Sequence, residues 1–366
     1  MERTRRGLDY TLITIVALLL GTGLLMVYSS STAMALEDFR NPYYFAQRQL
    51  LWALLGLGSM WAFSRIPPWF WQERWKQILI AVVVMLILVV IPGIGIYRLG
   101  ARRWLGAGPL SFQPSEFAKF AFIIFLANYL GGKGREMKSF WHGLAPALGV
   151  LLLLFGLIML EPDLGTSLTL GGTGFLMLFA GGAELTHLGA LGALGAVGVF
   201  GLARIDPERW SRITTFLNPW SDPTDSGYQI IQALLAFGSG GLFGVGFGNS
   251  RQKFFYLPER HTDMIFAVIG EELGFIGAVA VLLLFLAFAW RGYRIAVEAP
   301  DRFSSLLAVG VTSLITLQAA MNIAVVTASI PSTGIPLPFI SYGGTSLLIT
   351  LSGVGILLGV SRHCKN

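Results

Sequence analysis

The sequence has 366 residues, of which 54% are hydrophobic and 13% are charged, and its mean hydropathy is +0.67. An ordinary soluble domain carries about 25% charged residues, so the repeated long apolar runs of this chain indicate a polytopic membrane protein. The net charge of +6 is scattered over short loops, which argues against a nucleic-acid partner. The single cysteine, Cys364, excludes an intrachain disulfide and a cysteine-rich metal site.

Apolar segments, each near the ~20 residues that a helix needs to cross the hydrocarbon of a membrane, recur along the whole chain. They fall at 11–29, 48–64, 77–97, 115–131, 143–160, 164–182, 186–203, 264–290, 304–328 and 345–361. The sequence therefore predicts an all-α polytopic membrane protein, a single membrane domain over residues 1–366 with about ten transmembrane helices. The first segment is too long for a signal-peptide core and lacks a cleavage site, so we expect it to be the first span.

The distribution of lysine and arginine predicts the orientation of these spans. Basic residues are more frequent in the segments that a cytoplasmic N-terminus places inside, which predicts that both termini are cytoplasmic. The outer loops at 92–114 and 204–263 nevertheless hold many basic residues that topology does not require. These residues either contact solvent and anionic headgroups or bind an anionic substrate on the outer face.

Two pairs of charged residues lie at outer span ends in the first half of the chain. Glu116 and Lys119 are spaced i, i+3 at the start of the fourth span, where they can form a structural ion pair or act on a substrate directly. Glu161 and Asp163 form a carboxylate pair that a tight turn between spans explains equally well. Upstream of the first pair, Arg102 and Arg103 either hold phosphate or sugar or anchor the chain at the interface.

Residues 204–263 form the long extracytoplasmic loop between the seventh and eighth spans. Its stretch 228–236 is apolar on one side, as expected of a helix that lies along the membrane interface. A glycine-rich stretch at 238–248 follows. Glycine-rich loops can wrap phosphate with backbone N–H groups, but this spacing fits no nucleotide fingerprint.

The stretch 254–274 concentrates ionisable groups at a membrane boundary, where such groups are costly and usually functional. Asp263 lies where the long loop becomes the eighth span. A carboxylate at a wet membrane edge can ionise while burial and neighbouring charges tune its pKa, but aspartate is also a good helix N-cap. Position alone leaves both roles open. Glu271 and Glu272 lie deeper, Glu271 about 12 Å further along a continuous helix, where structural pairing is an alternative.

The segment 330–344 contains three prolines that break the helical pattern near the outer edge. Irregular backbone is tolerated in a membrane only when it is buried in protein or lines a wet cavity. The sequence therefore predicts a cavity wall here, built partly by Ser341 and Tyr342. The four histidines are dispersed, so a dedicated histidine metal site is not expected.

Three separated stretches resemble the SEDS family (shape, elongation, division and sporulation). They are GARRWLGAGPLSFQPSEFAK at 100–119, LPERHTDMIFAVIGEELG at 257–274 and IPLPFISYGGTSLL at 335–348. The resemblance covers essentially the whole chain. VYSSS at 27–31 and NPYYFAQRQ at 41–49 are closer to the FtsW and SpoVE branch of division and sporulation than to the RodA branch of elongation. Arg260 departs from the division branch, where alanine is common, and Met264 stands where phenylalanine is usual.

The resemblance implies a peptidoglycan glycosyltransferase that polymerises lipid II into β-1,4 glycan strands on the outer face of the bacterial cytoplasmic membrane, at the septum or in elongation. It implies that Asp263 is the essential catalytic residue, acting as general base, and that Glu116 and Lys119 form a structural or functional pair. The implied partners are a class B penicillin-binding protein, which is a transpeptidase, and other proteins of the division or elongation machinery.

Lipid II carries a pyrophosphate, a disaccharide and a lipid tail, so its binding requires basic groups at the outer interface, and arginine forks suit pyrophosphate. The candidate substrate-binding residues are Arg102, Arg103, Arg212, Lys253, Arg260, His261 and Ser341. A divalent cation, Mg²⁺ or Mn²⁺, is expected to help neutralise the leaving group, with ligands that the sequence does not identify. The alternatives are a lipid II flippase and a non-catalytic scaffold of the division machinery.

Overall fold

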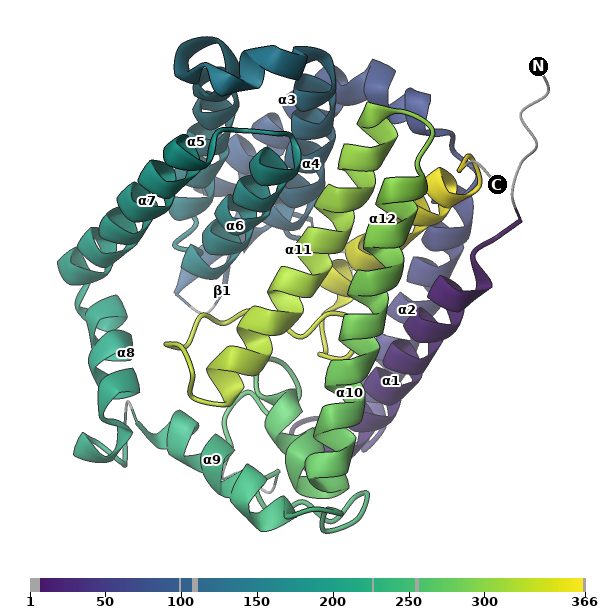
Figure 1. The fold of residues 1–366 in the computed structure, drawn as a ribbon. Coiled ribbons are helices and arrows are strands. Elements are labelled where there is room, and N and C mark those ends of the chain that lie inside the picture. Colours follow the sequence, from purple (N-terminus) through teal and green to yellow (C-terminus); the bar gives the residue numbers. More distant parts are fainter. Residues whose placement is uncertain (1–6, 99, 107–110, 226, 254–256, 365–366) are drawn as a thin grey trace.

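The computed structural model describes residues 7–98, 100–106, 111–225, 227–253 and 257–364. In these regions ten long helices form one bundle (Figure 1). They are α1 (Tyr10–Phe39), α2 (Tyr44–Phe63), α3 (Pro68–Val90), α4 (Pro114–Lys133), α5 (Ala145–Met159), α6 (Leu164–Ala180), α7 (Leu185–Ile205), α10 (Ile265–Glu298), α11 (Arg302–Val326) and α12 (Gly344–Ser361).

Each of the ten predicted spans is occupied by one of these helices, which confirms the all-α polytopic fold class. Six described helices are long and apolar enough to cross a membrane by length and composition alone. They are α1, α7, α10, α11, α12 and the continuous helical stretch Phe140–Met159, which includes α5. Helix α6 is apolar but shorter. Helices α2, α3 and α4 have 20, 23 and 20 residues, which at 1.5 Å per residue matches the ~30 Å of hydrocarbon.

The core of the bundle is built around α11 and α12. Helix α11 packs against α4, α6, α10 and α12, and α12 packs along α2. Most of the side chains of α12 are buried. Helix α7, by contrast, leans away from the bundle in Figure 1 and buries only Leu188 and Ala203. Its exposed apolar surface is what a helix that faces lipid requires.

Helix α10 is broken, which corrects the expectation of one continuous span at 264–290. Gly274 has φ 68° and ψ −169°, a backbone conformation that divides the helix into 265–273 and 275–298. The part from 275 onward is long enough to cross the hydrocarbon by itself. The short part before it therefore forms a separate half-helix that leads from the outer loop into the span.

The glycine-rich loop 241–248 pairs with this break. The backbone N–H of Val245 donates to the carbonyl oxygen of Glu271 at 3.0 Å. A Cβ atom at Gly244 would lie 2.1 Å from the carbonyl oxygen of Glu272, so only glycine permits this approach. The glycines of the loop thus serve close backbone packing against α10.

Two shorter helices, α8 (Pro207–Leu217) and α9 (Tyr228–Gly240), cover the same end of the bundle as this loop (Figure 1). The sequence predicted a helix at 228–236, and α9 confirms it, but α8 was not predicted. A two-stranded antiparallel hairpin of β1 (Ile96–Arg98) and β2 (Ala101–Trp104) was not predicted either. The start of α1 and the end of α12 lie at the opposite end of the molecule.

Candidate active site

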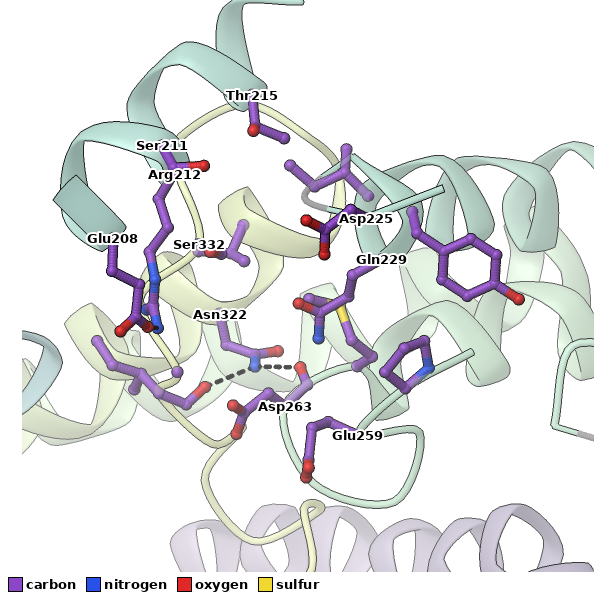
Figure 2. Close-up of a pocket in the computed structure, with 17 residues that line it drawn as sticks. Glu208, Ser211, Arg212, Thr215, Asp225, Gln229, Glu259, Asp263, Asn322 and Ser332 are labelled. Carbon is purple, nitrogen blue, oxygen red and sulfur yellow. Dashed lines mark hydrogen bonds and ion pairs between the residues drawn. The ribbon is translucent and has the colours of Figure 1, made fainter. Parts of the chain in front are cut away.

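A cavity of about 440 Å³ lies where α8, α9, the turn before α10 and the connection from α11 to α12 meet (Figure 2). Its described wall holds four carboxylates, those of Glu208, Asp225, Glu259 and Asp263, and one guanidinium, that of Arg212. The two short outer helices therefore close over the residue that the sequence singled out.

A tight turn positions Asp263 at this cavity. The carbonyl oxygen of Glu259 accepts the N–H groups of Thr262 and Met264, both at 3.1 Å, and the Thr262 hydroxyl donates to the Glu259 carboxylate at 2.6 Å. Helix α10 begins at Ile265 with Met264 as its N-cap and with no side-chain capping bond. The alternative that Asp263 serves as the helix cap is therefore wrong, and its carboxylate is left for the cavity.

The floor of the site is fixed by Asn322 of α11, which donates to the carbonyl oxygens of Asp263 at 2.8 Å and Ile335 at 2.7 Å (Figure 2). Gly334, with φ 70°, lies directly against the aspartate, because a Cβ atom there would be 3.6 Å from Asp263 Oδ2. The proline-rich connection thus forms a cavity wall, as predicted, but through Ser332, Gly334 and Ile335, while the expected Ser341 and Tyr342 are not among the described wall residues.

The surroundings of Asp263 favour its protonated form. Burial above all, with the nearby carboxylates of Glu259 and Asp163, raises the pKa of its carboxyl to about 7, and the guanidinium of Arg212 opposes this shift. A base works best when its pKa is close to the working pH. At neutral pH this carboxylate is therefore ionised in part of the molecules and remains basic enough to take a proton from a hydroxyl group.

Comparison with known proteins assigns the family. The family model for FtsW, RodA and SpoVE, described as "cell cycle protein", matches residues 10–366. The chain belongs to the FtsW/RodA/SpoVE family. This confirms the resemblance stated above, which rested on three motifs.

Relatives match this family member over almost its full length. "Stage V sporulation protein E" of Bacillus subtilis is 50% identical over 365 residues, covering 100% of both chains. "Probable peptidoglycan glycosyltransferase FtsW" of Geobacter metallireducens is 43% identical over 358 residues, covering 98% of this chain and 95% of the relative.

Solved structures share the fold. A chain in a structure described as "structural coordination of polymerization and crosslinking by a peptidoglycan synthase complex" has a TM-score of 0.80 at 29% identity, covering 97% of this chain and 98% of that one. The rod shape determining protein RodA of Thermus thermophilus has a TM-score of 0.72 at 29% identity, covering 98% of each chain.

Several basic residues of this FtsW/RodA/SpoVE protein are predicted to hold phosphate. Among them, Arg212 lies in the described wall of the cavity. Its Nη2 lies 2.8 Å from the Glu208 carboxylate one turn earlier on α8, and its side chain is 45% exposed. A half-exposed guanidinium in a surface ion pair loses little when it exchanges partners. Arg212 is therefore able to contact an anionic group in the cavity.

Arg102 and Arg103 lie on β2 beside the turn between α5 and α6, and neither is among the described residues of the cavity wall. The guanidinium of Arg102 stands over the ring of Tyr97 at 5.9 Å. Arg103 donates to the carbonyl oxygens of Glu161 at 2.8 Å and Pro162 at 2.7 Å. Arg103 therefore holds the turn, and the substrate contact expected of this pair stays a prediction.

The carboxylates of that turn have structural surroundings. Asp163 caps α6 by accepting the N–H of Thr166 at 3.0 Å, and it also accepts the amide of Gln113 at 3.0 Å. The side chain of Glu161 is fully buried, and burial, with Asp163 nearby, raises its pKa to about 8. Asp163 therefore has the structural role that a tight turn between spans predicts. Glu161 is instead a buried carboxyl whose raised pKa favours its protonated form at neutral pH.

Lys253, which the sequence predicts to hold phosphate, is buried and is not among the described residues of the cavity wall. Its Nζ lies 3.0 Å from the Glu272 carboxylate and 3.1 Å from the Ser29 hydroxyl of α1. The neighbouring Glu271 accepts the backbone N–H of Arg251 at 2.9 Å. Both glutamates thus anchor the end of the glycine-rich loop to α10, in agreement with their structural reading.

Arg260 and His261 belong to the turn that carries Asp263 but are buried on its other side and outside the described cavity wall. The ring of His261 packs between Phe45 and Tyr342, at 4.8 and 5.6 Å between centroids. Burial lowers the pKa of both side chains, and the carboxylates of Asp38, Glu37 and Glu259 oppose this shift at Arg260. In this structure both side chains pack beneath the turn, and their role as substrate contacts stays a prediction.

Ser341 joins the two segments that meet at the site. Its hydroxyl donates to the carbonyl oxygen of Thr262 at 2.7 Å and accepts the N–H of Leu337 at 2.8 Å. The side chain is buried and does not belong to the described cavity wall. Ser341 therefore positions the turn of Asp263, and its substrate contact stays a prediction.

The predicted ion pair of Glu116 and Lys119 is formed and buried, with 2.8 Å between Nζ and Oε1. Lys119 also approaches Gln318 of α11 at 3.4 Å, and Gln318 in turn approaches the carbonyl oxygen of Pro336 at 3.5 Å. Neither charged residue is in the described cavity wall. The pair therefore supports the wall from behind, which favours its structural reading.

Proposed function

We propose that this protein is a peptidoglycan glycosyltransferase that polymerises lipid II into β-1,4 glycan strands at the outer face of the bacterial cytoplasmic membrane. The observation that carries the proposal is the Asp263 carboxylate, held without a capping role at a cavity at one end of a membrane bundle. A relative with 43% identity is named a probable peptidoglycan glycosyltransferase, and a solved chain with this fold comes from a peptidoglycan synthase complex.

In the proposed reaction Asp263 takes the proton of the 4-hydroxyl of the N-acetylglucosamine of one lipid II molecule. That oxygen attacks the anomeric carbon of the N-acetylmuramic acid at the reducing end of the donor chain. The bond from this carbon to the α-linked pyrophosphate breaks, a β-1,4 bond forms, and undecaprenyl pyrophosphate leaves. The configuration inverts because attack and departure occur on opposite faces. A positioned base contributes about 10²–10⁴-fold to such a step.

The leaving pyrophosphate requires positive charge, which Arg212 supplies in part as a guanidinium fork. The cavity carboxylates of Glu208, Asp225 and Glu259 are oxygen ligands of the kind that Mg²⁺ and Mn²⁺ take, and Mg²⁺ is often held by one or two carboxylates and substrate phosphates. The described residues include no group of three acidic, histidine or cysteine side chains arranged for a metal. We therefore propose that a divalent cation is held jointly with the pyrophosphate, whose charge it neutralises.

The orientation follows from the same geometry. The cavity lies at the end of the bundle opposite the start of α1 and the end of α12 (Figure 1). With both termini in the cytoplasm, as the basic loops predict, the cavity opens on the outer side. We propose a class B penicillin-binding protein as partner, together with other division or elongation proteins. A septal location is favoured, since the relatives include FtsW and a sporulation protein.

The flippase alternative is less well supported, because a carrier places its substrate site near the middle of the bilayer. Here the cavity that holds Asp263 is lined by residues of α8 and α9, and these two helices lie at one end of the bundle (Figure 1). A non-catalytic scaffold would not require the carboxyl of Asp263 to have a pKa of about 7 or to lie against Gly334 in a cavity wall.

The deciding experiment measures glycan polymer from lipid II with the purified full chain in liposomes, with Mg²⁺ or Mn²⁺ and with the partner transpeptidase. The wild type should form polymer, Asp263→Ala should form none, and Glu184→Gln, at an exposed carboxylate beside α7, should match the wild type. Polymer from Asp263→Ala at the wild-type rate contradicts the assignment of the base. Lipid II that crosses the liposome membrane without any polymer supports the flippase.

A further inference from the structure

The side chain of Asn322 has one group that the fold does not use. The residue lies in α11 with 1% of its surface exposed, and it belongs to the cavity wall. Both N–H bonds of its amide are taken by backbone carbonyl oxygens, those of Asp263 and Ile335. Its Oδ1 is buried and has no hydrogen-bond partner among the described residues.

The orientation of this amide is fixed by chemistry. An amide turned by 180° would place Oδ1 against two carbonyl oxygens, and none of the three can donate a hydrogen bond. The nitrogen must therefore face Asp263 and Ile335, and the oxygen must face away from them. Figure 2 shows the amide nitrogen of Asn322 joined by dashed lines to two backbone carbonyl oxygens, while its amide oxygen is joined to none of the groups drawn.

A buried carbonyl oxygen without a partner is a costly arrangement that native proteins rarely keep without a function. Apart from a metal ion, which an amide oxygen can also coordinate, a ligand in the cavity satisfies it only with a hydrogen-bond donor. An ionised phosphate has acceptors alone and cannot do so, whereas a sugar offers hydroxyl groups and the N–H of an N-acetyl group. Asn322 is thus matched to the saccharide part of a glycolipid, in contrast to Arg212, which is matched to its phosphates.

We propose that Asn322 Oδ1 is a saccharide subsite that accepts a hydrogen bond from a hydroxyl or N-acetyl N–H group of the acceptor sugar. The same amide holds the backbone of Asp263, with 2.8 Å between Nδ2 and the carbonyl oxygen. The sugar contact and the base are therefore tied to one rigid side chain, which sets the distance between the bound sugar and the carboxylate. This inference rests on the proposed function, since it names a binding group for that reaction.

The test measures binding rather than turnover, in an Asp263→Ala background that cannot consume the ligand. Lipid II and undecaprenyl pyrophosphate, which lacks the sugars, are titrated separately into the full chain in lipid nanodiscs. Adding Asn322→Ala should weaken lipid II binding about fivefold to tenfold, the size of one neutral hydrogen bond, and leave undecaprenyl pyrophosphate binding unchanged. Equal losses for both ligands, or no loss for lipid II, overturn the proposal.

Gln318→Ala is the matched control, because Gln318 lies one turn earlier on α11 and approaches the adjacent carbonyl of Pro336 but is not in the described cavity wall. It should leave lipid II binding unchanged, and a loss equal to that of Asn322→Ala shows a purely structural effect and overturns the proposal. Where Asn322→Ala does not fold, lipid II analogues with single hydroxyl groups replaced by fluorine, or with the N-acetyl nitrogen methylated, are titrated into the Asp263→Ala protein.

At least one of these analogues should bind about fivefold to tenfold more weakly, since fluorine and a methylated amide cannot donate. Full affinity for every analogue overturns the subsite. Failure of the proposed function gives a different result from failure of the subsite. If the wild type forms no polymer and the Asp263→Ala protein binds no lipid II, the proposed reaction itself is wrong. Polymer from the wild type with normal lipid II binding by Asn322→Ala removes only the subsite.

Discussion

Asp263→Asn is expected to stabilise the folded protein while it abolishes polymerisation. The pKa of Asp263 is raised from 3.8 to about 7 by burial and by neighbouring carboxylates. Each pKa unit corresponds to about 1.36 kcal/mol of free energy, so ionisation of this carboxyl above pH 7 lowers the free energy of unfolding by about 4 kcal/mol. Asparagine resembles the protonated carboxyl in shape and carries no charge, so the substitution removes this penalty.

The sign and the pH window follow from proton linkage. Between about pH 4 and pH 7 the folded protein keeps a proton on Asp263 that the unfolded chain has lost, so the free energy of unfolding falls as the pH rises through this window. The advantage of Asp263→Asn over the wild type should therefore grow from about 1.5 kcal/mol at pH 5 to about 4 kcal/mol at pH 8. Below about pH 4 it should vanish.

The assay is thermal unfolding of the purified protein in one detergent at pH 5 and pH 8. A gain of about 4 kcal/mol corresponds to a rise of roughly 5–8 °C in the midpoint for a chain of this size. Glu184→Gln, which neutralises an exposed carboxylate, should change the midpoint by less than about 1 °C at either pH. An equal rise for Asp263→Asn at both pH values, or no rise at pH 8, refutes the claim that burial of the charge destabilises the fold.

Two further outcomes concern the same site, and a third concerns the buried pair of Lys253 and Glu272. The initial rate of polymerisation at saturating lipid II should rise about tenfold per pH unit below pH 7 and level off above it, because ionised Asp263 is the active form; a flat profile contradicts the base. Gly334→Ala should slow polymerisation, since its φ is 70° and its Cβ would crowd the carboxylate, whereas Gly182→Ala, at φ 85° in open surroundings, should retain the rate. Lys253→Met should lower the free energy of unfolding by about 3–5 kcal/mol, because it leaves the charge of Glu272 buried without a cation. Adding Glu272→Gln should recover part of that loss in the same unfolding assay. Absence of any recovery argues against the ion pair.

The fold could be predicted from the sequence because the membrane imposes a strong local rule. A segment that crosses lipid must be apolar for about twenty residues, and this rule places all ten spans. The break at Gly274 could not be predicted, because it depends on the backbone pairing of the loop 241–248 with α10. The start of α8 had a readable signal that was missed, since Asp206 and Pro207 form a typical N-cap and first helical position.

The site could be predicted only in part. Charge at the membrane edge drew attention to Asp263 and Arg212, and both line the cavity. The same argument could not give the partners of Arg103 and Lys253 inside the fold, because a charge count gives the side of the membrane and not the group that each side chain contacts. Asn322 was missed, although a polar amide in an apolar span is itself a signal of function or of interhelical bonding.

Among the described residues, the buried pair of Glu116 and Lys119 is linked toward the site through Gln318 of α11. Lys119 reaches Gln318 at 3.4 Å, a long contact, whereas Asn322, one turn further along the same helix, holds Asp263 at 2.8 Å. The short hydrogen bond of α11 therefore holds Asp263, whereas its contact with Lys119 of the ion pair is long and weak.

Glu116→Ala or Lys119→Ala should consequently act mainly on folding, because either change leaves a buried charge without its partner, at a cost of about 3–5 kcal/mol. The folded yield after size-exclusion chromatography should fall, and the rate per folded molecule should change by less than about threefold. The double variant Glu116→Gln with Lys119→Met should recover most of the yield, since no charge remains buried. Normal yields with a large loss of rate in the single variants would instead place the pair in direct contact with substrate.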